Sequence, residues 1–392
     1  MPTILQINFS NFGSTGKIAE QIGTLAINQG WKSYFAYSRG NNESNSEIIR
    51  IGGKMNMYWH GFESRIWDNQ GLASRISTIK LVKQIVKISP DIIHLHNIHG
   101  YYLNYKILFE FLKRYNRPIV WTLHDCWPMT GHCCYFTIAD CSKWKTQCSD
   151  CPLKNDYPKS FLFDRSKQNY IDKKKTFTNI KNLHIVSVSN WLNEIVKESF
   201  LGYANLHVIH NGVDMSCFKP MSQKKKDFFL ILGVSNVWDQ RKGLFDFFKL
   251  RDLLSEDYHI TLVGLTKTQI NSLPKGIFGM TRTANQKELA DLYASSNVFV
   301  NTTYADNFPT VNIEALACGT PVITYNTGGS PEAVDKKTGF VVPKGDVFEL
   351  ERTIKKICLN PFKIEDCRER AELLYDKNIA FLKYIDLYKS LL

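Results

Sequence analysis

Short apolar runs alternate with longer segments of helical spacing along the chain. Residues 3–9 predict a buried strand, and a polar loop that contains glycine follows it through Gly16. A helix is predicted next, ending near Gly30, because apolar residues recur every three or four positions. These residues are Ile18, Ile22, Leu25 and Ala26. The other strands predicted in the first half are residues 92–95, 119–123 and 183–188.

The second half repeats this alternation after a polar, lysine-rich stretch that ends near Asp227. We place a domain boundary before that stretch, with an N-terminal domain at residues 1–210 and a C-terminal domain at 211–376. Helical spacing of apolar residues in 377–392 predicts a last helix that packs back onto the first domain. The strands predicted in the second domain are residues 228–234, 259–263, 298–301, 321–325 and 339–342.

Strands that alternate with helices are typical of parallel, doubly wound sheets, so the fold class predicted is α/β with two Rossmann-like domains. We expect these domains to face each other across a central cleft. Ligands of such sheets bind at the carboxyl ends of the strands, where four polar loops fall. These loops are residues 10–16, the His124 region, 240–243 and 306–309.

The composition is that of a globular protein, with 44% hydrophobic and 22% charged residues, and no stretch approaches the roughly 18 apolar residues of a membrane span. No basic leader precedes the first strand, so a cytosolic location is predicted. The net charge of +12 has clusters at Lys173–Lys175 and Lys224–Lys226. Nucleic acid, anionic lipid and acidic substrates all fit that charge, and the lack of a nucleic-acid-binding motif favours lipid headgroups.

Residues 304–325, YADNFPTVNIEALACGTPVITY, place the carboxylates of Asp306 and Glu314 eight positions apart. Pro309 suits the first turn of a helix, and the N–H groups after it are expected to point outward and attract a phosphate. Those N–H groups belong to Thr310, Val311 and Asn312. Carboxylates accept hydrogen bonds from hydroxyls, so a sugar nucleotide is the predicted ligand. The alternative is an ordinary strand-loop-helix unit with an acidic helix start.

This acidic pair, together with ALACGTPVI and NTGGSPE, resembles the glycosyltransferases of family four, which are retaining enzymes of the GT-B type. The resemblance covers most of the chain. The family usually has glutamate where Asp306 stands, and the aspartate form is similar to a branch that builds capsule and colanic-acid-like surface polysaccharides. The resemblance implies transfer of a sugar from a nucleotide donor to a glycan or lipid-linked acceptor, at the inner face of the plasma membrane.

The same resemblance implies roles for individual residues. Glu314 is expected to bind the ribose hydroxyls, Asp306 to lie near hydroxyls of the donor sugar, and the N–H groups of Thr310 and Val311 to face the diphosphate. Lys242 matches the family's lysine that neutralises the leaving diphosphate. Arg241 is the substitute for an arginine that the family carries directly after the strand, and an exposed surface arginine is the alternative.

In the first domain the resemblance implies two further contacts. The loop Gly13-Ser14-Thr15-Gly16 is expected to contact the donor phosphate or the acceptor, because glycine permits close backbone approach. His124 is expected to hydrogen-bond the transferred sugar, with a structural histidine as the alternative. His96 and His99 either reach the acceptor or have a packing role in the protein. A metal site is disfavoured there, because their segment contains no acidic partner.

Departure of a diphosphate develops negative charge, which preformed positive potential stabilises. No catalytic metal is predicted, because the cleft loops lack a DxD-like motif and the family is usually metal-independent. No residue stands out as a carboxylate nucleophile, although Asp306 and Asp125 are candidates. Retention therefore rests on the resemblance, which implies front-face attack with the leaving phosphate accepting the proton.

Six of the ten cysteines lie in the insertion at residues 126–152. A reducing cytosol disfavours disulfides, and Cys148-x-x-Cys151 with Cys141 and either Cys133 or Cys134 suggests a structural zinc site, with Cys133 preferred. Free buried thiols are the alternative. The aromatic residues of this insertion either shape the acceptor pocket or form its small core. They are Trp127, Tyr135, Phe136 and Trp144.

Two other functions compete with glycosyl transfer. A GT-B sugar-nucleotide epimerase or phosphorylase would use the same nucleotide or phosphate chemistry without a glycan acceptor. A zinc-dependent nucleic-acid-binding protein would account for the basic charge and the cysteines, with binding that weakens steeply in salt. It leaves the polar loops at the strand ends unexplained.

Overall fold

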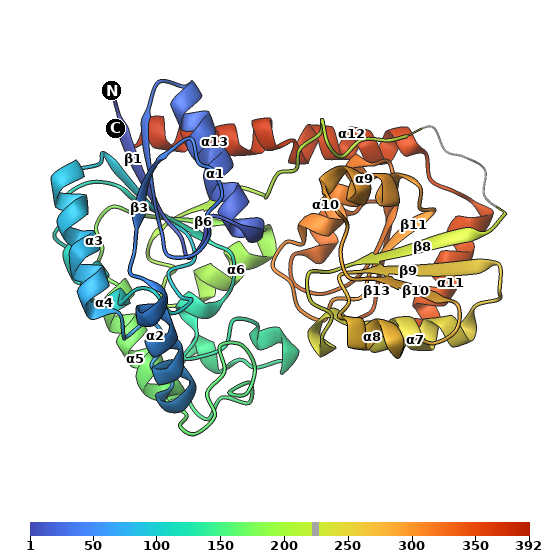
Figure 1. Cartoon of the computed structure of the whole chain (residues 1–392), viewed down its shortest axis with the longest axis horizontal. Helices are drawn as coiled ribbons and strands as arrows, with labels where there is room; N and C mark the ends of the chain where they lie inside the picture. Colours follow the sequence, from blue (N-terminus) through green and yellow to red (C-terminus); the bar gives the residue numbers. More distant parts are fainter. Residues whose placement is uncertain (222–226) are drawn as a thin grey trace. The chain divides into compact units, whose positions relative to one another are not determined.

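A computed structural model describes residues 1–221 and 227–392 of the chain (Figure 1). The predicted basic cluster Lys224–Lys226 lies outside these residues. The chain folds into two compact units. Unit 1 comprises Met1–His210 and Phe381–Leu392, and unit 2 comprises Asn211–Ala380.

Unit 1 contains a seven-stranded parallel sheet in the order β3-β2-β1-β4-β5-β6-β7. Its strands are β1 (Thr3–Ile7), β2 (Lys32–Tyr37), β3 (Glu47–Arg50), β4 (Ile92–Leu95), β5 (Ile119–Leu123), β6 (Leu183–Ser187) and β7 (Asn205–Val208). Its helices are α1 (Gly13–Asn28), α2 (Lys54–Trp67), α3 (Arg75–Ile88), α4 (Tyr105–Leu112), α5 (Ser166–Phe177) and α6 (Asn190–Glu198). Three short 3-10 turns lie in the cysteine-rich insertion: Trp127–Met129, Phe136–Ile138 and Lys143–Lys145.

Unit 2 contains a six-stranded parallel sheet in the order β10-β9-β8-β11-β12-β13. Its strands are β8 (Phe229–Val234), β9 (Tyr258–Val263), β10 (Ile277–Met280), β11 (Val298–Asn301), β12 (Val322–Tyr325) and β13 (Gly339–Val342). Its helices are α7 (Leu244–Leu253), α8 (Lys267–Asn271), α9 (Gln286–Ala294), α10 (Thr310–Ala317), α11 (Val347–Leu359) and α12 (Ile364–Tyr375). Helices α9, α10 and α12 cover one face of this sheet, and α7 and α11 pack together on the other (Figure 1).

The sequence correctly predicts the fold class and the strands at the centre of each sheet. Four strands escape it: β2 and the outermost strands β3, β7 and β10. Edge strands are poorly marked in sequence because one side faces water, and β3 (EIIR) has no buried residue.

The last helix, α13 (Lys377–Ser390), begins in unit 2 and ends in unit 1. Of the C-terminal helix predicted to pack back onto the first domain, residues 381–392 lie in unit 1 and residues 377–380 lie in unit 2. These residues stay in unit 2 because Lys377 Nζ bonds to Asp214 Oδ2 at 2.6 Å, and because a Cβ on Gly212 would lie 2.6 Å from Lys377 Cα. Further along, the hydroxyl of Tyr384 lies 3.1 Å from Thr122 Oγ1, and that of Tyr388 lies 2.6 Å from His94 Nδ1.

Both sheets reverse their strand order at one point, between β1 and β4 in unit 1 and between β8 and β11 in unit 2. The loops that leave these strands diverge to opposite sides, which opens a crevice at the carboxyl ends. The loops before Gly13, before Lys242 and around Asp306 follow three of these four strands. The loop of His124 follows β5, the neighbour of β4.

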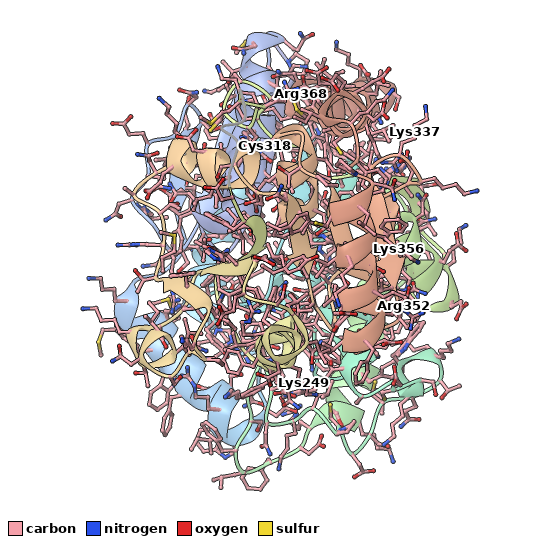
Figure 2. All side chains as sticks on the ribbon, turned by 90° about the vertical axis from the view of Figure 1, so that its right-hand side faces the viewer. Lys249, Cys318, Lys337, Arg352, Lys356 and Arg368 are labelled. Atoms are coloured by element: carbon pink, nitrogen blue, oxygen red, sulfur yellow. The ribbon has the colours of Figure 1, made fainter. Side chains whose placement is uncertain are left out.

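Basic side chains of unit 2 lie on its outer surface, including Lys249 of α7 and Arg352 and Lys356 of α11 (Figure 2). The cluster at Lys173–Lys175 behaves differently from the prediction. The side chain of Lys173 is buried, and its Nζ donates to the backbone oxygens of Trp127 at 2.8 Å and Thr130 at 3.0 Å. Burial lowers the pKa of Lys173 to about 7, so this residue has a structural role and does not add to the surface charge.

Candidate active site

The loops after β8 and β11 bring together two predicted catalytic residues. Lys242 Nζ lies 2.6 Å from Asp306 Oδ2, with both side chains about one fifth exposed or less. Lys242 is the last residue of a short 3-10 turn, Gln240–Lys242. Asp239 caps the start of this turn, and its Oδ1 accepts a hydrogen bond from the Lys242 N–H at 3.0 Å. The ammonium group is thus fixed at the end of the sheet, where it adds positive potential beside a carboxylate.

Two glycines allow the loops around Asp306 to pack this closely. Gly243 has φ +70°, and a Cβ there would lie 2.3 Å from Thr302 O. Gly328, in the NTGG segment, has φ +53°, and a Cβ would lie 1.8 Å from Asp306 O. The Gly329 N–H also donates to Asp306 O at 3.2 Å. Backbone contacts therefore set the position of Asp306.

Arg241 is tied to the same loop. Its Nη1 donates to Ala305 O at 3.0 Å, and its own backbone oxygen accepts from the Tyr304 N–H at 2.7 Å. The side chain is half-buried. The alternative of an exposed surface arginine is therefore wrong, although these bonds also give Arg241 a structural role in holding the loop.

Helix α10 carries the other predicted donor-binding residues. Pro309 is the N-cap, with φ −71° and ψ 117°, and not the first helical residue as predicted. The N–H groups of Thr310 and Val311 begin the helix, where no helical acceptor exists for them. The Asn312 N–H, predicted to be unpaired, donates to Pro309 O at 3.2 Å. Its side chain bonds Asn301 and Ser330 O, so Asn312 serves to dock the helix.

Glu314 lies on α10 one turn further on and is half-buried. Its Oε2 accepts a hydrogen bond from the hydroxyl of Tyr293 on α9 at 3.1 Å. Burial raises the pKa of Tyr293 well above its ordinary value, so the phenol stays a donor. A fixed carboxylate with a second oxygen is well suited to accept from vicinal hydroxyls. The sequence pattern did not reveal Tyr293.

In unit 1 the segment Gly13-Ser14-Thr15-Gly16 is the first turn of α1, and not the loop that was predicted. Gly13 has φ +71°, and a Cβ on Gly16 would lie 2.7 Å from Asn11 C, so both positions need glycine. The first N–H groups of the helix are without helical acceptors, as at α10. The segment is helical and not a loop, but its free-pointing N–H groups can still bind an anion, as expected from the sequence.

His124 follows β5 and joins a chain of hydrogen-bonding groups. Its Nε2 lies 3.2 Å from His96 Nδ1, and His96 Nε2 lies 3.1 Å from Gln6 Oε1. Because the Gln6 oxygen only accepts, His96 Nε2 carries its proton, and His96 Nδ1 accepts from His124. Burial lowers the pKa of His96 well below its ordinary value and that of His124 to about 4, so both rings are neutral near pH 7. This tautomer makes His124 Nδ1 an acceptor, as a sugar hydroxyl requires.

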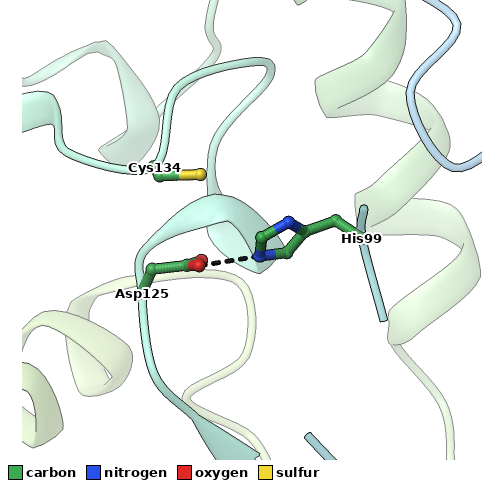
Figure 3. A group of neighbouring side chains, drawn as sticks. All are labelled: His99, Asp125 and Cys134. Carbon is green, nitrogen blue, oxygen red and sulfur yellow. Dashed lines mark hydrogen bonds and ion pairs between the residues drawn. The ribbon is translucent and has the colours of Figure 1, made fainter. Parts of the chain in front are cut away.

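His99 has an acidic partner that its own segment did not reveal. Its Nε2 lies 2.7 Å from Asp125 Oδ2 (Figure 3), and its Nδ1 lies 3.3 Å from the hydroxyl of Tyr157. Although burial opposes it, the His99 imidazole lowers the pKa of Asp125 below its ordinary value. Together with Cys134 Sγ these groups offer ligand atoms that all lie within 4.8 Å of one another. Within residues 1–221 and 227–392, this is the only such set of three.

The four thiols predicted to bind zinc do not form such a compact set. The sulfurs of Cys133, Cys141, Cys148 and Cys151 nevertheless line one cavity. The thiols of Cys133 and Cys151 are neighbours in this cavity and interact with each other. Trp144 is buried and lies 5.0 Å from the ring of Phe136, so these two aromatics form a local core.

Two family models match consecutive parts of the chain. Glycosyltransferase Family 4 matches residues 25–216, and Glycosyl transferases group 1 matches residues 218–374. The chain therefore belongs to the GT-B glycosyltransferases that combine these two family models.

Individual relatives agree with this membership, and solved structures share the fold. A putative colanic acid biosynthesis glycosyl transferase, WcaC of Escherichia coli K12, is 25% identical over 99% of this chain and 100% of its own. CapM, a capsular polysaccharide biosynthesis glycosyltransferase of Staphylococcus aureus, is 26% identical over 53% of this chain and 59% of its own. The structure of HepE from Anabaena in complex with UDP superposes with a TM-score of 0.69 at 15% identity, covering 100% of both chains. Sucrose-phosphate synthase from Thermosynechococcus elongatus has a TM-score of 0.74 at 18% identity, covering 100% and 99%.

Within the described part of the chain, no helix combines the length and the apolar character needed to span a bilayer.

Proposed function

We propose that this glycosyltransferase transfers a sugar, with retention of anomeric configuration, from a nucleoside diphosphate sugar to a glycan or lipid-linked acceptor in surface polysaccharide synthesis. The observation that carries the proposal is the arrangement in unit 2. The Lys242–Asp306 pair lies in loops next to the start of α10, and Glu314 lies on that helix. A cation, a helix N-terminus and two carboxylates match the phosphates and hydroxyls of a sugar nucleotide.

Each residue has a distinct part in the proposed reaction. Glu314 accepts from the ribose hydroxyls, while the Thr310 and Val311 N–H groups and Lys242 bind the diphosphate. Lys242 and Arg241 stabilise the charge that grows on the leaving phosphate as the glycosidic bond breaks. Asp306 accepts from hydroxyls of the donor sugar, and His124 Nδ1 does the same in unit 1. The leaving phosphate takes the proton of the acceptor hydroxyl on the same face of the sugar, so no carboxylate nucleophile is required.

Donor binding provides the direct test. Calorimetric titration with UDP, GDP, ADP and dTDP, without added metal, is expected to give one clear binder. Glu314→Ala is expected to weaken that binder roughly ten- to a hundredfold, because two charge-assisted hydrogen bonds are lost. Asp291→Ala, which removes a carboxylate of α9 instead, is the matched control and should bind like the parent protein. If none of the four nucleotides binds, the proposed function is wrong.

Membrane contact is the second part of the proposal, and it rests on an aromatic surface of unit 1. On α2, Tyr58, Trp59 and Phe62 are 66%, 61% and 48% exposed. Residues 161–163, with side chains 54% to 63% exposed, lie alongside, because the Phe161 N–H donates to Arg65 O at 2.7 Å. We call α2 and residues 161–163 the aromatic surface. Exposed large apolar groups this dense are unusual and mark a site of contact.

Basic residues flank the aromatic surface. Lys54 and Arg65 on α2 and Lys159 before residue 161 are all exposed. Aromatic side chains that enter the headgroup region, with cations beside them, are the composition of a surface that binds anionic lipid. This placement would bring the enzyme to a lipid-linked acceptor.

Flotation with vesicles of phosphatidylethanolamine and phosphatidylglycerol tests this contact. Replacing Trp59 and Phe62 together with serine is expected to reduce the bound fraction about tenfold or more, because each aromatic contributes roughly 1.5–3 kcal/mol when buried. Phe348→Ser is the matched control, since Phe348 is 70% exposed on α11 of unit 2. Equal binding by the double variant and the parent protein would exclude this surface as the lipid contact.

A further inference from the structure

The cysteine-rich insertion surrounds a cavity that glycosyl transfer does not use. Its wall includes Cys133, Cys141, Cys148, Cys151, His132 and Trp144. We call this the cysteine cavity. Four thiols and an imidazole around one cavity are a concentration of soft ligands that packing alone does not require.

His132 gives the clearest sign of a missing partner. The residue is 2% exposed, and its Nδ1 lies 2.6 Å from Asp68 Oδ1. Its Nε2 is buried and has no hydrogen-bond partner in the structure. A buried ring nitrogen without a partner is costly, and a histidine whose other nitrogen donates to a carboxylate is the arrangement found at metal ligands. The backbone N–H of Arg165 donates to the second oxygen of Asp68 at 2.9 Å, which fixes the carboxylate.

The backbone around the thiols is arranged as it is around bound thiolates. The backbone N–H of Gly131 faces the sulfur of Cys148, and that of Leu153 faces the sulfur of Cys151. Lys143 Nζ donates to the backbone oxygens of Ser149 at 2.9 Å and Asp150 at 3.1 Å, which holds the turn between the two cysteines. Donors aimed at sulfur stabilise the anionic form that a metal needs.

We propose that the cysteine cavity binds one zinc ion through His132 Nε2 and the thiolates of Cys133, Cys148 and Cys151. Nitrogen and sulfur ligands in a closed set of four select zinc over magnesium or calcium. On binding, the three thiols release their protons and their side chains turn inward to reach tetrahedral distances. Asp68 acts as a positioning residue that holds the histidine tautomer.

Charge balance selects His132 over Cys141 as the fourth ligand. Zinc with three thiolates carries a net charge of −1, whereas four thiolates would carry −2. Buried Lys173 lies next to this site, since it bonds to Thr130 O two residues before His132, and thiolates beside it favour its charged form. Its ammonium offsets the carboxylate of Asp68, so the arrangement with His132 leaves one buried negative charge and the arrangement with Cys141 leaves two.

Metal content of the purified full-length protein is the first test, with one zinc per chain expected. After removal of the metal by a chelator, Co(II) titration of the parent protein is expected to give the visible absorption of a tetrahedral site with thiolate ligands. Asp68→Asn keeps the shape of the side chain and is expected to weaken zinc about 10- to 100-fold. His132→Ala should weaken it at least as much, whereas Cys141→Ser should retain one zinc.

Several results would overturn the proposal. A protein that contains no zinc and shows no Co(II) absorption has no such site. Loss of metal in Cys141→Ser together with retention in His132→Ala would replace the histidine by the fourth thiol. Because the parent protein alone answers the first question, a variant that fails to fold does not obscure the outcome. Nucleotide binding, measured separately, tests the transferase and not this site.

Discussion

Lys242→Ala is expected to lower kcat by about 10²- to 10³-fold, while the affinity for the donor changes much less. The reason is that the ammonium interacts most strongly with the charge that develops on the leaving diphosphate, so its loss raises the barrier to transfer. The 2.6 Å contact with Asp306 places this cation in the loop beside α10. Steady-state kinetics of donor turnover, with and without acceptor, provide the measurement.

A neighbouring lysine supplies the control for this experiment. Lys249 lies on α7, the helix that follows the same loop, and its side chain is 70% exposed. Lys249→Ala removes the same charge from unit 2 and should leave kcat within about twofold, because an exposed charge is screened by solvent. Equal kcat for the Lys242 variant and the parent protein would show that another group stabilises the leaving diphosphate.

Arg368→Ala is expected to destabilise unit 2 by about 3–4 kcal/mol. Its guanidinium, on α12, donates to Ala317 O at 2.7 Å, to Met215 O at 3.1 Å and to Phe218 O at 2.5 Å. Ala317 ends α10, so Arg368 caps the helix that carries Glu314. Without the arginine, these three backbone oxygens lose a charged hydrogen-bond donor, which lowers the free energy of unfolding. Denaturant unfolding measures the change.

Arg352 offers a matched comparison on the same unit. Its side chain lies on α11 (Figure 2) and is 65% exposed. Among the ion pairs of the described residues, it pairs only with Glu349, one turn earlier on that helix. Exposed pairs of this kind contribute about 0.3–0.5 kcal/mol, so Arg352→Ala should be nearly neutral. If both variants lose the same stability, the bonds of Arg368 to backbone oxygens do not matter in solution.

The sequence predicts the fold well because alternation of apolar runs and helical spacing is a local property, and parallel sheets place loop residues at one edge. It therefore finds Asp306, Lys242 and His124 in loops after strands. It fails where partners are distant in sequence. Tyr293 and Glu314 are 21 residues apart, and His132 and Asp68 are 64 apart. No local pattern records that such residues meet, because only the packing of separate elements brings them together.

Local conformation near glycine is the other limit of sequence interpretation. Gly13 and Gly16 suggest a loop, since glycine disfavours helix interiors by roughly 0.5–1 kcal/mol. In the structure they form the first turn of α1, where tight contact with the backbone of Asn11 requires a residue without a Cβ. Tertiary contact thus overrides local preference at these glycines. Pro309 keeps its usual φ of −71° and lies one position before the first helical residue.

The division of α13 between two units bears on how the chain is made. Tyr384 and Tyr388 follow all of unit 2 in the sequence. Their hydroxyls contact Thr122 of β5 and His94 of β4 in unit 1. A ribosome releases residues 1–210 first, yet that unit lacks its closing helix until the whole of unit 2 has also emerged. We therefore expect the nascent N-terminal unit to remain less protected from proteases than the mature one, with His94 partly unpaired throughout the interval.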